Sequence, residues 1–379
     1  MKTGYFMTAE MIDESKPDTS SGITKKILAQ AKALDALVGC ELVIMKHRER
    51  KLPRGIRGIW TRLPYTGISN CWFYEERFKH AKFICIRREF IDQSFIRFLK
   101  KVKKESPETK ILLELPNYPY NRGKGRYGKF GYPFYLKNEL GVLKLKKFLD
   151  RIITYSSHKE IFGVQTINIT NGIDFDLVKE RKFHNSKQDN AIHMIGVAQI
   201  REWHGYDRLV EGLHAYYQNG GKREIVVHLV GDAITEYDFE QKIQEYKLES
   251  RVIMHGRKSG RELDEIYDKC TLGLDAFGTY RIGLKNSSSL KTREYIAKGL
   301  PIVTCPHLDL EDDYEYVKYV KDEDSPLNFE EILTYYDKIY KNHNEFEVIK
   351  EIRQYGEERF DWKTVLMPVV NYVNGTDRI

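Results

Sequence analysis

Residues 286–303, NSSSLKTREYIAKGLPIV, form the stretch that decides the fold. The middle of this stretch has helical periodicity and stops at Gly299, and LPIVTC (300–305) then reads as an apolar strand. Strands that alternate with helices predict an α/β architecture, here a parallel Rossmann-like sheet of five strands. The four other apolar runs, each followed by a stretch with helical periodicity, are AIHMIGVAQ (191–199), EIVVHLVGD (224–232), RVIMHG (251–256) and TLGLDAF (271–277).

The first half of the chain has the same alternation in a less regular form. Helices are expected at 22–39, 96–104 and 143–151, and strands at CELVIM (40–45), KFICIR (82–87), KILLEL (110–115) and RIITYS (151–156).

The two alternating halves predict two domains. We expect the first at 1–185 and the second at 186–361, with a C-terminal helix at 362–379 that packs back onto the first domain. The segment 171–190 turns polar towards its end and precedes a strand, so the linker between the domains is expected there.

The composition excludes several classes of protein. Of the 379 residues, 41% are hydrophobic and 31% are charged, and the 25 Tyr and 18 Phe provide enough apolar surface to exclude a disordered chain. No apolar run reaches about 18 residues, and the N-terminus has no secretory pattern, so we expect a cytoplasmic protein. The five cysteines are far apart and include no CxxC, which argues against a disulfide framework or a zinc site.

Positive charge is concentrated in one segment. The net charge of the chain is +7, but residues 100–151 alone contain 14 Lys or Arg against 5 Asp or Glu. Within this segment, residues 121–134 combine glycine with basic and aromatic residues, which predicts a mobile loop. The segment could face nucleic acid, an anionic membrane or a polyanionic substrate, and a solvated surface explains it nearly as well.

The start of the helix within 286–303 has the features of a phosphate site. Ser287 to Ser289 can cap the helix, and its first backbone N–H groups have no intrahelical acceptors and lie at the positive end of the helix dipole. Lys291 adds a cation, and Glu294, one turn further on, can accept two hydroxyl protons from a vicinal diol such as ribose. An ordinary capped helix with a solvated Glu294 explains the segment equally well.

Two further loops follow strands of the same predicted sheet. In an open parallel sheet, ligands bind outside the carboxyl ends of the strands, where these loops meet. The loop 196–209 contains Arg201 and His204, which can contact an anion, and 254–265 contains Arg257, which can stack on a base. Each loop alone also fits an ordinary turn, but together the three describe a site for a nucleoside diphosphate. The chain has no Walker lysine pattern and no GxGxxG at a first strand, which disfavours an ATPase or a dehydrogenase.

With these elements in order, the chain resembles nucleotide-sugar-dependent glycosyltransferases of the family 4 type, which have the GT-B fold. The resemblance implies two Rossmann-like domains that face each other across a deep cleft. It covers nearly the whole chain and rests on SSGITKKILAQ (20–30), INITNGIDFD (167–176), WHGYDRL (203–209), VHLVGD (227–232), VIMHG (252–256), REYIAKGLPIV (293–303) and FDWKTVLMPVVNYV (360–373).

The resemblance also implies roles for individual residues. Glu294 matches the ribose-binding second glutamate of the family's E-x7-E motif, and Arg257 lies where the base is held. Gly22 matches the glycine loop that faces the donor phosphates. The stretch that holds the diphosphate falls at Ser288, Ser289, Leu290 and Lys291.

The sequence departs from the family at several of these positions. The first motif glutamate falls at Asn286, and the usual arginine and lysine that bind the diphosphate fall at Gln199 and His204. Arg201 and Lys291, with Lys285 or Arg281, could replace that charge. Asn117 and Tyr118 follow KILLEL, where the family often has a catalytic histidine.

The implied activity is the transfer of a sugar, with retention, from a nucleoside-diphosphate sugar to a hydroxyl of a glycan or lipid-linked acceptor. UDP is the expected nucleotide, no metal or other cofactor is expected, and a bacterial surface polysaccharide is the expected product. Arg201, His204 and Lys291 would stabilise the charge of the leaving β-phosphate, which would also take the proton of the acceptor. Peripheral contact with the inner face of the cytoplasmic membrane would bring the chain to a lipid-linked acceptor.

Other functions stay open at this point. The departures at Asn286 and Gln199 also fit a catalytically silent GT-B subunit that binds a glycan or a partner transferase. A hydrolase or epimerase that acts on nucleotide sugars is a third possibility, and a nucleic-acid binder fits least well. The sequence does not indicate the oligomeric state.

Overall fold

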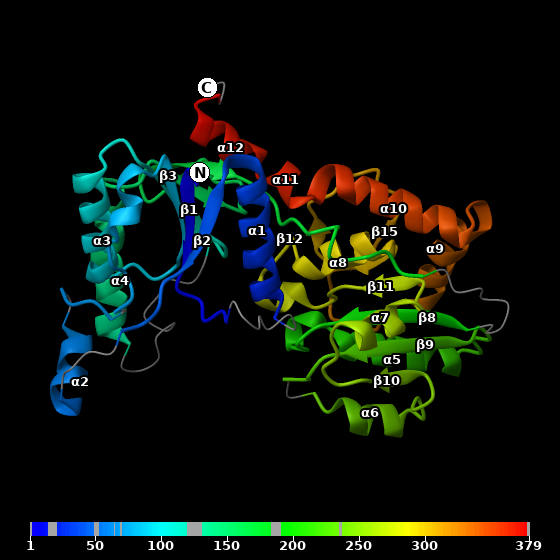
Figure 1. Cartoon of the computed structure of the whole chain (residues 1–379). Coiled ribbons are helices and arrows are strands. Elements are labelled where there is room, and N and C mark those ends of the chain that lie inside the picture. The colour runs from blue at the N-terminus through cyan, green and yellow to red at the C-terminus, as the bar shows by residue number, and fades with distance from the viewer. Residues whose placement is uncertain are drawn as a thin grey trace. The chain divides into compact units, whose positions relative to one another are not determined.

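The computed structural model describes residues 2–13, 21–48, 53–63, 65–68, 70–119, 131–182, 191–234 and 237–376. Contacts within the chain define two compact units, shown in Figure 1 and described separately below. The first unit comprises Met1–Asp18, Ile23–Thr170 and Trp362–Ile379, and the second comprises Thr19–Gly22 and Asn171–Asp361. The expected domain boundary at 185/186 falls outside the described residues, and the second unit already begins at Asn171.

The first unit is built on a seven-stranded sheet in the order β2-β1-β3-β4-β5-β7-β6. All neighbouring strands are parallel except the antiparallel pair β6 and β7. The four expected strands are confirmed, while β1, β6 and β7 were not expected. The strands are β1 (Gly4–Thr8), β2 (Cys40–Ile44), β3 (Phe83–Arg87), β4 (Lys110–Leu115), β5 (Arg151–Thr154), β6 (Glu160–Ile161) and β7 (Val164–Asn168).

Helices bury both faces of this sheet. Successive side chains of a strand point to opposite faces, so Ile84 and Ile86 of β3 lie in one apolar cluster and Phe83 and Cys85 in another. The first cluster contains residues of α3 and α4, and the second contains residues of α1, α11 and α12. The helices of this unit are α1 (Gly22–Val38), α2 (Arg54–Arg62), η1 (Glu76–His80), α3 (Gln93–Glu105), α4 (Tyr132–Leu145), α11 (Trp362–Val365) and α12 (Met367–Asn374).

The helix expected at 143–151 is largely wrong. Helix α4 ends at Leu145, and β5 begins at Arg151. Leu145 and Leu149 are both buried with helical spacing, which explains the expectation. However, the carboxylate of Asp150 accepts hydrogen bonds from the Ile111 amide (2.7 Å) and the Lys103 ammonium (2.9 Å), and these bonds tie the chain to the neighbouring strand.

The second unit is built on a six-stranded, fully parallel sheet in the order β10-β9-β8-β11-β13-β15. The five expected strands are confirmed, and β15 is an additional edge strand. A short separate pair, β12 and β14, lies beside the start of α8 in sequence. The strands are β8 (Ile192–Val197), β9 (Ile225–Val230), β10 (Val252–Met254), β11 (Leu272–Leu274), β12 (Asn286–Ser287), β13 (Ile302–Thr304), β14 (His307–Leu308) and β15 (Val317–Tyr319).

The helices of the second unit follow its strands in a regular alternation. Their apolar sides join the buried strands in a single core cluster. Because all six strands are parallel, the loops that follow them lie at one edge of the sheet. The helices are η4 (Glu202–His204), α5 (Tyr206–Gln218), α6 (Phe239–Glu245), α7 (Arg261–Tyr267), η5 (Thr279–Ile282), α8 (Leu290–Lys298), α9 (Phe329–Asn342) and α10 (Glu345–Phe360).

Two further features bear on the expectations from composition. All five cysteines are buried, and none of them is in a disulfide. Among the helices of the described ranges, none combines the length and the apolar character that a membrane span needs. Of the loop expected at 121–134, residues 121–130 lie outside the described residues.

Exchanging Gly212 for Ala should destabilise the second unit. A Cβ atom at Gly212, in the middle of α5, would lie within 3.0 Å of the Leu327 backbone, which hydrogen-bonds to the same helix. We expect the Gly212→Ala variant to lose about 1–3 kcal/mol of the free energy of unfolding, measured by chemical denaturation. Gly55→Ala, also in a helix but with no atom within 4 Å of the new Cβ, should leave the free energy of unfolding unchanged or raise it by up to about 1 kcal/mol, because alanine favours a helix. Equal losses in both variants would contradict this account.

Candidate functional site

Helix α8 begins at the edge of the second sheet with its N-terminus capped. Ser289 has extended backbone angles, and its hydroxyl accepts a hydrogen bond of 3.1 Å from the Thr292 amide. The amides of Leu290 and Lys291 have no intrahelical acceptor, because the preceding residues are not helical. Together with the helix dipole, these two N–H groups provide a place for an anion. Ser287, which was also expected to cap the helix, lies in β12 instead.

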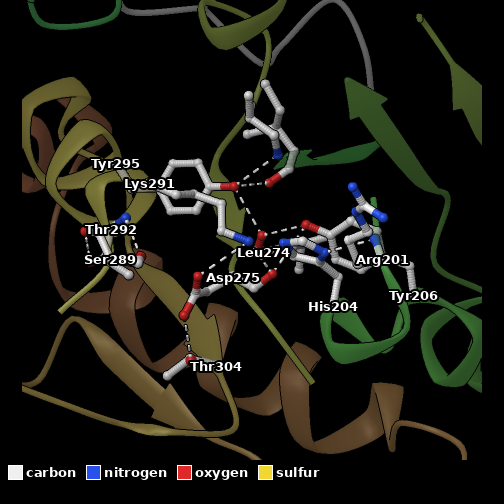
Figure 2. Close-up of polar contacts among 12 residues, drawn as sticks. Arg201, His204, Tyr206, Leu274, Asp275, Ser289, Lys291, Thr292, Tyr295 and Thr304 are labelled. Carbon is white, nitrogen blue, oxygen red and sulfur yellow. Dashed lines mark hydrogen bonds and ion pairs between the residues drawn. The ribbon is translucent and has the colours of Figure 1, made fainter. Parts of the chain in front are cut away.

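Lys291 is bound to Asp275, at the end of β11. Its ammonium donates a hydrogen bond of 2.6 Å to the Asp275 backbone carbonyl and lies 3.2 Å from a carboxylate oxygen of the same residue (Figure 2). The other carboxylate oxygen accepts a bond of 2.9 Å from the Thr304 hydroxyl, and Asp275 is only 1% exposed. Burial lowers the pKa of Lys291, and the Asp275 charge opposes that shift. The Lys291 cation is therefore balanced by a buried carboxylate that sequence analysis did not identify.

His204 is neutral in this site. Its Nδ1 accepts a hydrogen bond of 3.0 Å from the Arg201 amide, so in the neutral ring the proton must be on Nε2. Burial, followed by the charge of Lys291, lowers the pKa of His204 to about 3. Among the described residues, none makes a hydrogen bond to Nε2. His204 can thus offer an anion a neutral N–H donor but not a positive charge.

Arg201 keeps a charge that no carboxylate balances within the described ranges. Its guanidinium lies 3.3 Å from the side-chain oxygen of Gln199 and 5.9 Å from the Trp203 ring centroid. Arg281 differs, because it forms a two-pronged ion pair with Asp207 (2.7 and 3.0 Å) and a further pair with Asp324. Of these two arginines, Arg201 is therefore the one able to meet a ligand, because Arg281 is already balanced. Lys285, the other candidate cation, is exposed in the loop before α8.

Two buried tyrosines fix the strand ends that carry these groups. The Tyr206 hydroxyl lies 3.1 Å from the carbonyl oxygens of both Leu274 and Asp275 (Figure 2). The Tyr295 hydroxyl lies 2.9 Å from the Leu274 carbonyl oxygen and accepts a hydrogen bond of 3.1 Å from the Val197 amide. These bonds hold β8 and β11 at their carboxyl ends, where the loops of the site begin.

Some of the expected site residues have structural partners instead. The Ser288 hydroxyl accepts hydrogen bonds of 3.2 Å from the Asn171 amide and from the buried guanidinium of Arg293. Asn286 is exposed and pairs with His307 between β12 and β14. Both residues therefore support the loop before α8, and only Ser289, Leu290 and Lys291 form the N-terminus itself.

Glu294 and Arg257, which were expected to meet a nucleoside, lie in α8 and in the loop after β10. Glu294 is half-buried, and no hydrogen bond or ion pair joins its carboxylate to any other described residue. Its charge contributes to the raised pKa values of Tyr267 and Tyr295, which are due mainly to burial. Arg257 is exposed in the loop after β10, directly after Gly256, whose φ of +62° lies in the left-handed region.

Three histidines form a hydrogen-bonded row across β8, β9 and the end of β10. Nδ1 of His193 lies 2.9 Å from Nε2 of His228, and Nδ1 of His228 lies 2.9 Å from Nε2 of His255. Burial, and then the neighbouring histidines, lower the pKa of His228 to about 3. A neutral His228 has one N–H, so it donates to one neighbour and accepts from the other. The tautomer of His255, two residues before Arg257, is therefore linked to that of His193.

The remaining expected residues belong to other parts of the chain. Asn117 and Tyr118 lie in the first unit after β4, where the Asn117 side chain donates a hydrogen bond of 2.6 Å to Glu89. Tyr118 packs edge-on against His158, with ring centroids 4.9 Å apart, although His158 comes from the loop after β5. Sequence analysis found no histidine here because these two residues are far apart in the chain. Gly22 begins α1 and is grouped with the second unit.

Acid should weaken the fold through His204 and His228. Both have a folded-state pKa of about 3 against an ordinary value of 6.5, so below pH 6.5 the unfolded chain binds protons that the folded chain does not. Stability is therefore complete above pH 6.5 and falls as the pH decreases. Between pH 6.5 and 5, a fully buried histidine should cost about 1.5 kcal/mol of unfolding free energy.

The measurement is denaturant unfolding at several pH values. His228→Asn should flatten the dependence between pH 6.5 and 5, whatever its effect on stability at pH 7. His214→Asn, at a histidine that stacks on Tyr246 outside the row, should keep the wild-type slope. An unchanged slope in the His228 variant would show that His228 is not the group that resists protonation.

Comparisons with known proteins agree with this architecture. Residues 178–310, which contain all of these loops of the second unit, match the family model described as "Glycosyl transferases group 1". No match was found among curated proteins.

Solved structures share the fold at low sequence identity. HepE from Anabaena, in complex with UDP, has a TM-score of 0.58 at 14% identity, with 99% of this chain and 100% of that chain covered. A glycosyltransferase from Rickettsia africae has a TM-score of 0.60 at 12% identity, with the same coverage. Sucrose-phosphate synthase from Thermosynechococcus elongatus has a TM-score of 0.56 at 13% identity, with 99% of both chains covered. The chain thus has the two-domain GT-B fold of these enzymes.

Proposed function

We propose that the chain is a retaining, metal-independent glycosyltransferase of the family 4 type. It takes a sugar from a nucleoside-diphosphate sugar, with UDP as the nucleotide. It transfers that sugar to a hydroxyl of a glycan or lipid-linked glycan in the cytoplasm, in the synthesis of a bacterial surface polysaccharide. The observation that carries the proposal is the N-terminus of α8, which has open N–H groups and, one turn later, a carboxylate that no other described residue hydrogen-bonds. The family match over 178–310 supports the proposal. HepE, which has a related fold, was solved in complex with UDP.

In this proposal the diphosphate lies at the start of α8. The amides of Leu290 and Lys291 donate hydrogen bonds to its oxygens, and Arg201 supplies the main cation. Nε2 of His204 adds a neutral donor. Lys291 uses two of its three ammonium hydrogens on Asp275, so one remains for a phosphate oxygen.

The nucleoside extends from the diphosphate along the same helix. Glu294 accepts hydrogen bonds from the two ribose hydroxyls, which suits a carboxylate that no other described residue engages. Arg257 stacks on the base, beside the left-handed turn at Gly256.

The reaction then needs no protein nucleophile. The bond between the anomeric carbon and the β-phosphate oxygen breaks, and the acceptor oxygen bonds to that carbon on the same face of the sugar. The acceptor proton passes to the departing phosphate. Arg201, His204, Lys291 and the amides of α8 stabilise the charge on the phosphate, because their donors are already oriented before the charge develops.

Removing the Glu294 carboxylate should remove most of the donor binding. A donor at 100 times its dissociation constant should stabilise the wild type by about 2.7 kcal/mol, which a thermal-shift panel of UDP-, GDP- and ADP-sugars can detect. We expect the UDP-sugar to give the shift and Glu294→Ala to lose most of it. Glu262→Ala, at an exposed carboxylate paired with Lys258, should keep it. An undiminished shift in the Glu294 variant would mean that the ribose binds elsewhere.

The same fold also fits a catalytically silent subunit. Asn286 and Gln199 occur where the family has charged residues. Of the three groups expected to stabilise the leaving phosphate, His204 is neutral and Lys291 is balanced by Asp275, which leaves Arg201. Turnover of the donor by the purified chain alone separates the two functions.

We expect sugar transfer by the purified chain in the presence of EDTA, with a product of the same anomeric configuration as the donor, determined by NMR. Donor binding without transfer to any of a panel of glycan acceptors would favour the silent subunit. A product of inverted configuration, or loss of activity in EDTA, would overturn the mechanism but leave the donor site in place.

A further inference from the structure

Helix α2 of the first unit presents an apolar stripe to solvent. Ile56, Ile59 and Trp60 have the spacing i, i+3 and i+4, which places them on one face of the helix, and Leu63 follows directly after its last residue. In a folded domain such a face normally lies against the core. Here these side chains are 52%, 63%, 37% and 47% exposed, and Tyr65, just beyond the helix, is 67% exposed. The described residues of this unit therefore leave much of the stripe open to solvent.

The segment that carries the stripe is firmly attached at its C-terminal end. Lys137 of α4 is fully buried, and its ammonium donates hydrogen bonds to the Leu63 carbonyl, the Thr66 carbonyl (2.5 Å) and the Thr66 hydroxyl (2.7 Å). Two residues later, the Ile68 amide donates a bond of 2.7 Å to Asp92, which caps α3. The apolar side chains are thus displayed on a helix that is anchored to the domain.

The apolar stripe is accompanied by strong positive charge. Residues 46–62 contain seven Lys or Arg and a single acidic residue, Glu49. Lys46, Arg48 and Arg62 are exposed. A helix with an apolar face and basic flanks suits the boundary of an anionic bilayer, where the apolar side chains enter the acyl region and the cations meet the headgroups.

The basic segment 100–151 is less suited to this role. The Lys101 ammonium lies 2.7 Å from Glu105, and the Lys103 ammonium lies 2.9 Å from Asp150. Two of the five cations of α3 are therefore balanced within the domain. The segment 46–62 has seven cations to one acidic residue in its sequence, so its positive charge is less offset locally.

We propose that α2, with the turn to Tyr65, binds the surface of an anionic bilayer by inserting Ile56, Ile59, Trp60 and Leu63 between the lipids. A second copy of the chain is a poorer occupant, because a symmetric contact would bring the same cations together. One nine-residue helix also provides much less than the roughly 800 Å² per partner of a stable dimer. The proposal does not depend on sugar transfer, because it rests on the first unit alone.

The test is co-sedimentation of the full-length chain with lipid vesicles. The wild type should bind vesicles of phosphatidylcholine and phosphatidylglycerol, should bind phosphatidylcholine alone much less, and should be released by added salt. The double variant Ile56→Asp with Ile59→Asp should bind the anionic vesicles about tenfold more weakly or less. The double variant Leu177→Asp with Phe346→Asp, at exposed apolar residues of the second unit, should bind like the wild type.

Additional variants distinguish the bilayer from a different membrane surface or a second copy of the chain. The triple variant with Lys101, Lys103 and Lys104 changed to Glu should lose less vesicle binding than the α2 variant. A greater loss would indicate that α3 is the surface that binds the bilayer.

Unchanged binding of the α2 variant, equal binding to both lipid mixtures, or no vesicle binding by the wild type would each overturn the proposal. Dimers in sedimentation that the α2 variant abolishes would assign the stripe to a second copy instead. Donor-induced thermal shifts in the α2 variant should equal those of the wild type, which reports that the fold is intact.

Discussion

The ion pair between Lys291 and Asp275 is the interaction on which the candidate site depends. It joins the first turn of α8 to the end of β11, and the bond from Thr304 adds the end of β13. A buried carboxylate is costly unless it is paired and hydrogen-bonded, so these partners hold one another in a single arrangement. The position of the α8 N-terminus at the sheet edge follows from this pairing. The hydrogen bonds of Tyr295 and the ion pair between Arg293 and Asp309 hold the rest of the helix in place.

The same pair determines the electrostatics of the site. Asp275 balances Lys291, Asp207 and Asp324 balance Arg281, and His204 is neutral, whereas Arg201 brings a charge that no carboxylate in the described ranges offsets. An anion would then be held largely by oriented dipoles, namely the amides of α8 and Nε2 of His204. Such groups act through geometry, since a hydrogen-bond donor that is slightly misplaced loses most of its effect. The buried hydroxyls of Tyr206 and Tyr295, which fix the strand ends, therefore matter to binding although neither contributes a charge.

The sequence predicted the parallel sheets well and the electrostatics of the site poorly. Buried parallel strands are continuous apolar runs, so β8, β9, β10, β11 and β13 were all visible, whereas the short edge strand β15 was not. The capped start of α8 and the positions of Glu294 and Arg257 could likewise be predicted from local patterns. Asp275 could not, because its partner Lys291 is 16 residues away and a buried acid has no local signal. The contact between Tyr118 and His158 depends in the same way on two strands becoming neighbours.

Helix α2 shows a second limit of pattern reading. An i, i+3, i+4, i+7 stripe predicts a helix with one apolar face, but the spacing is the same whether that face meets a core, a partner or a bilayer. The choice depends on what lies opposite. The exposure of Ile59 argues against the core of the first unit, and the excess of basic residues in 46–62 favours an anionic surface. An anchored helix loses little conformational freedom when it binds, because its backbone is already ordered in the free protein. Little of the free energy gained by burying its apolar face is then offset by lost conformational entropy. For this reason even a short helix can be effective at a lipid surface.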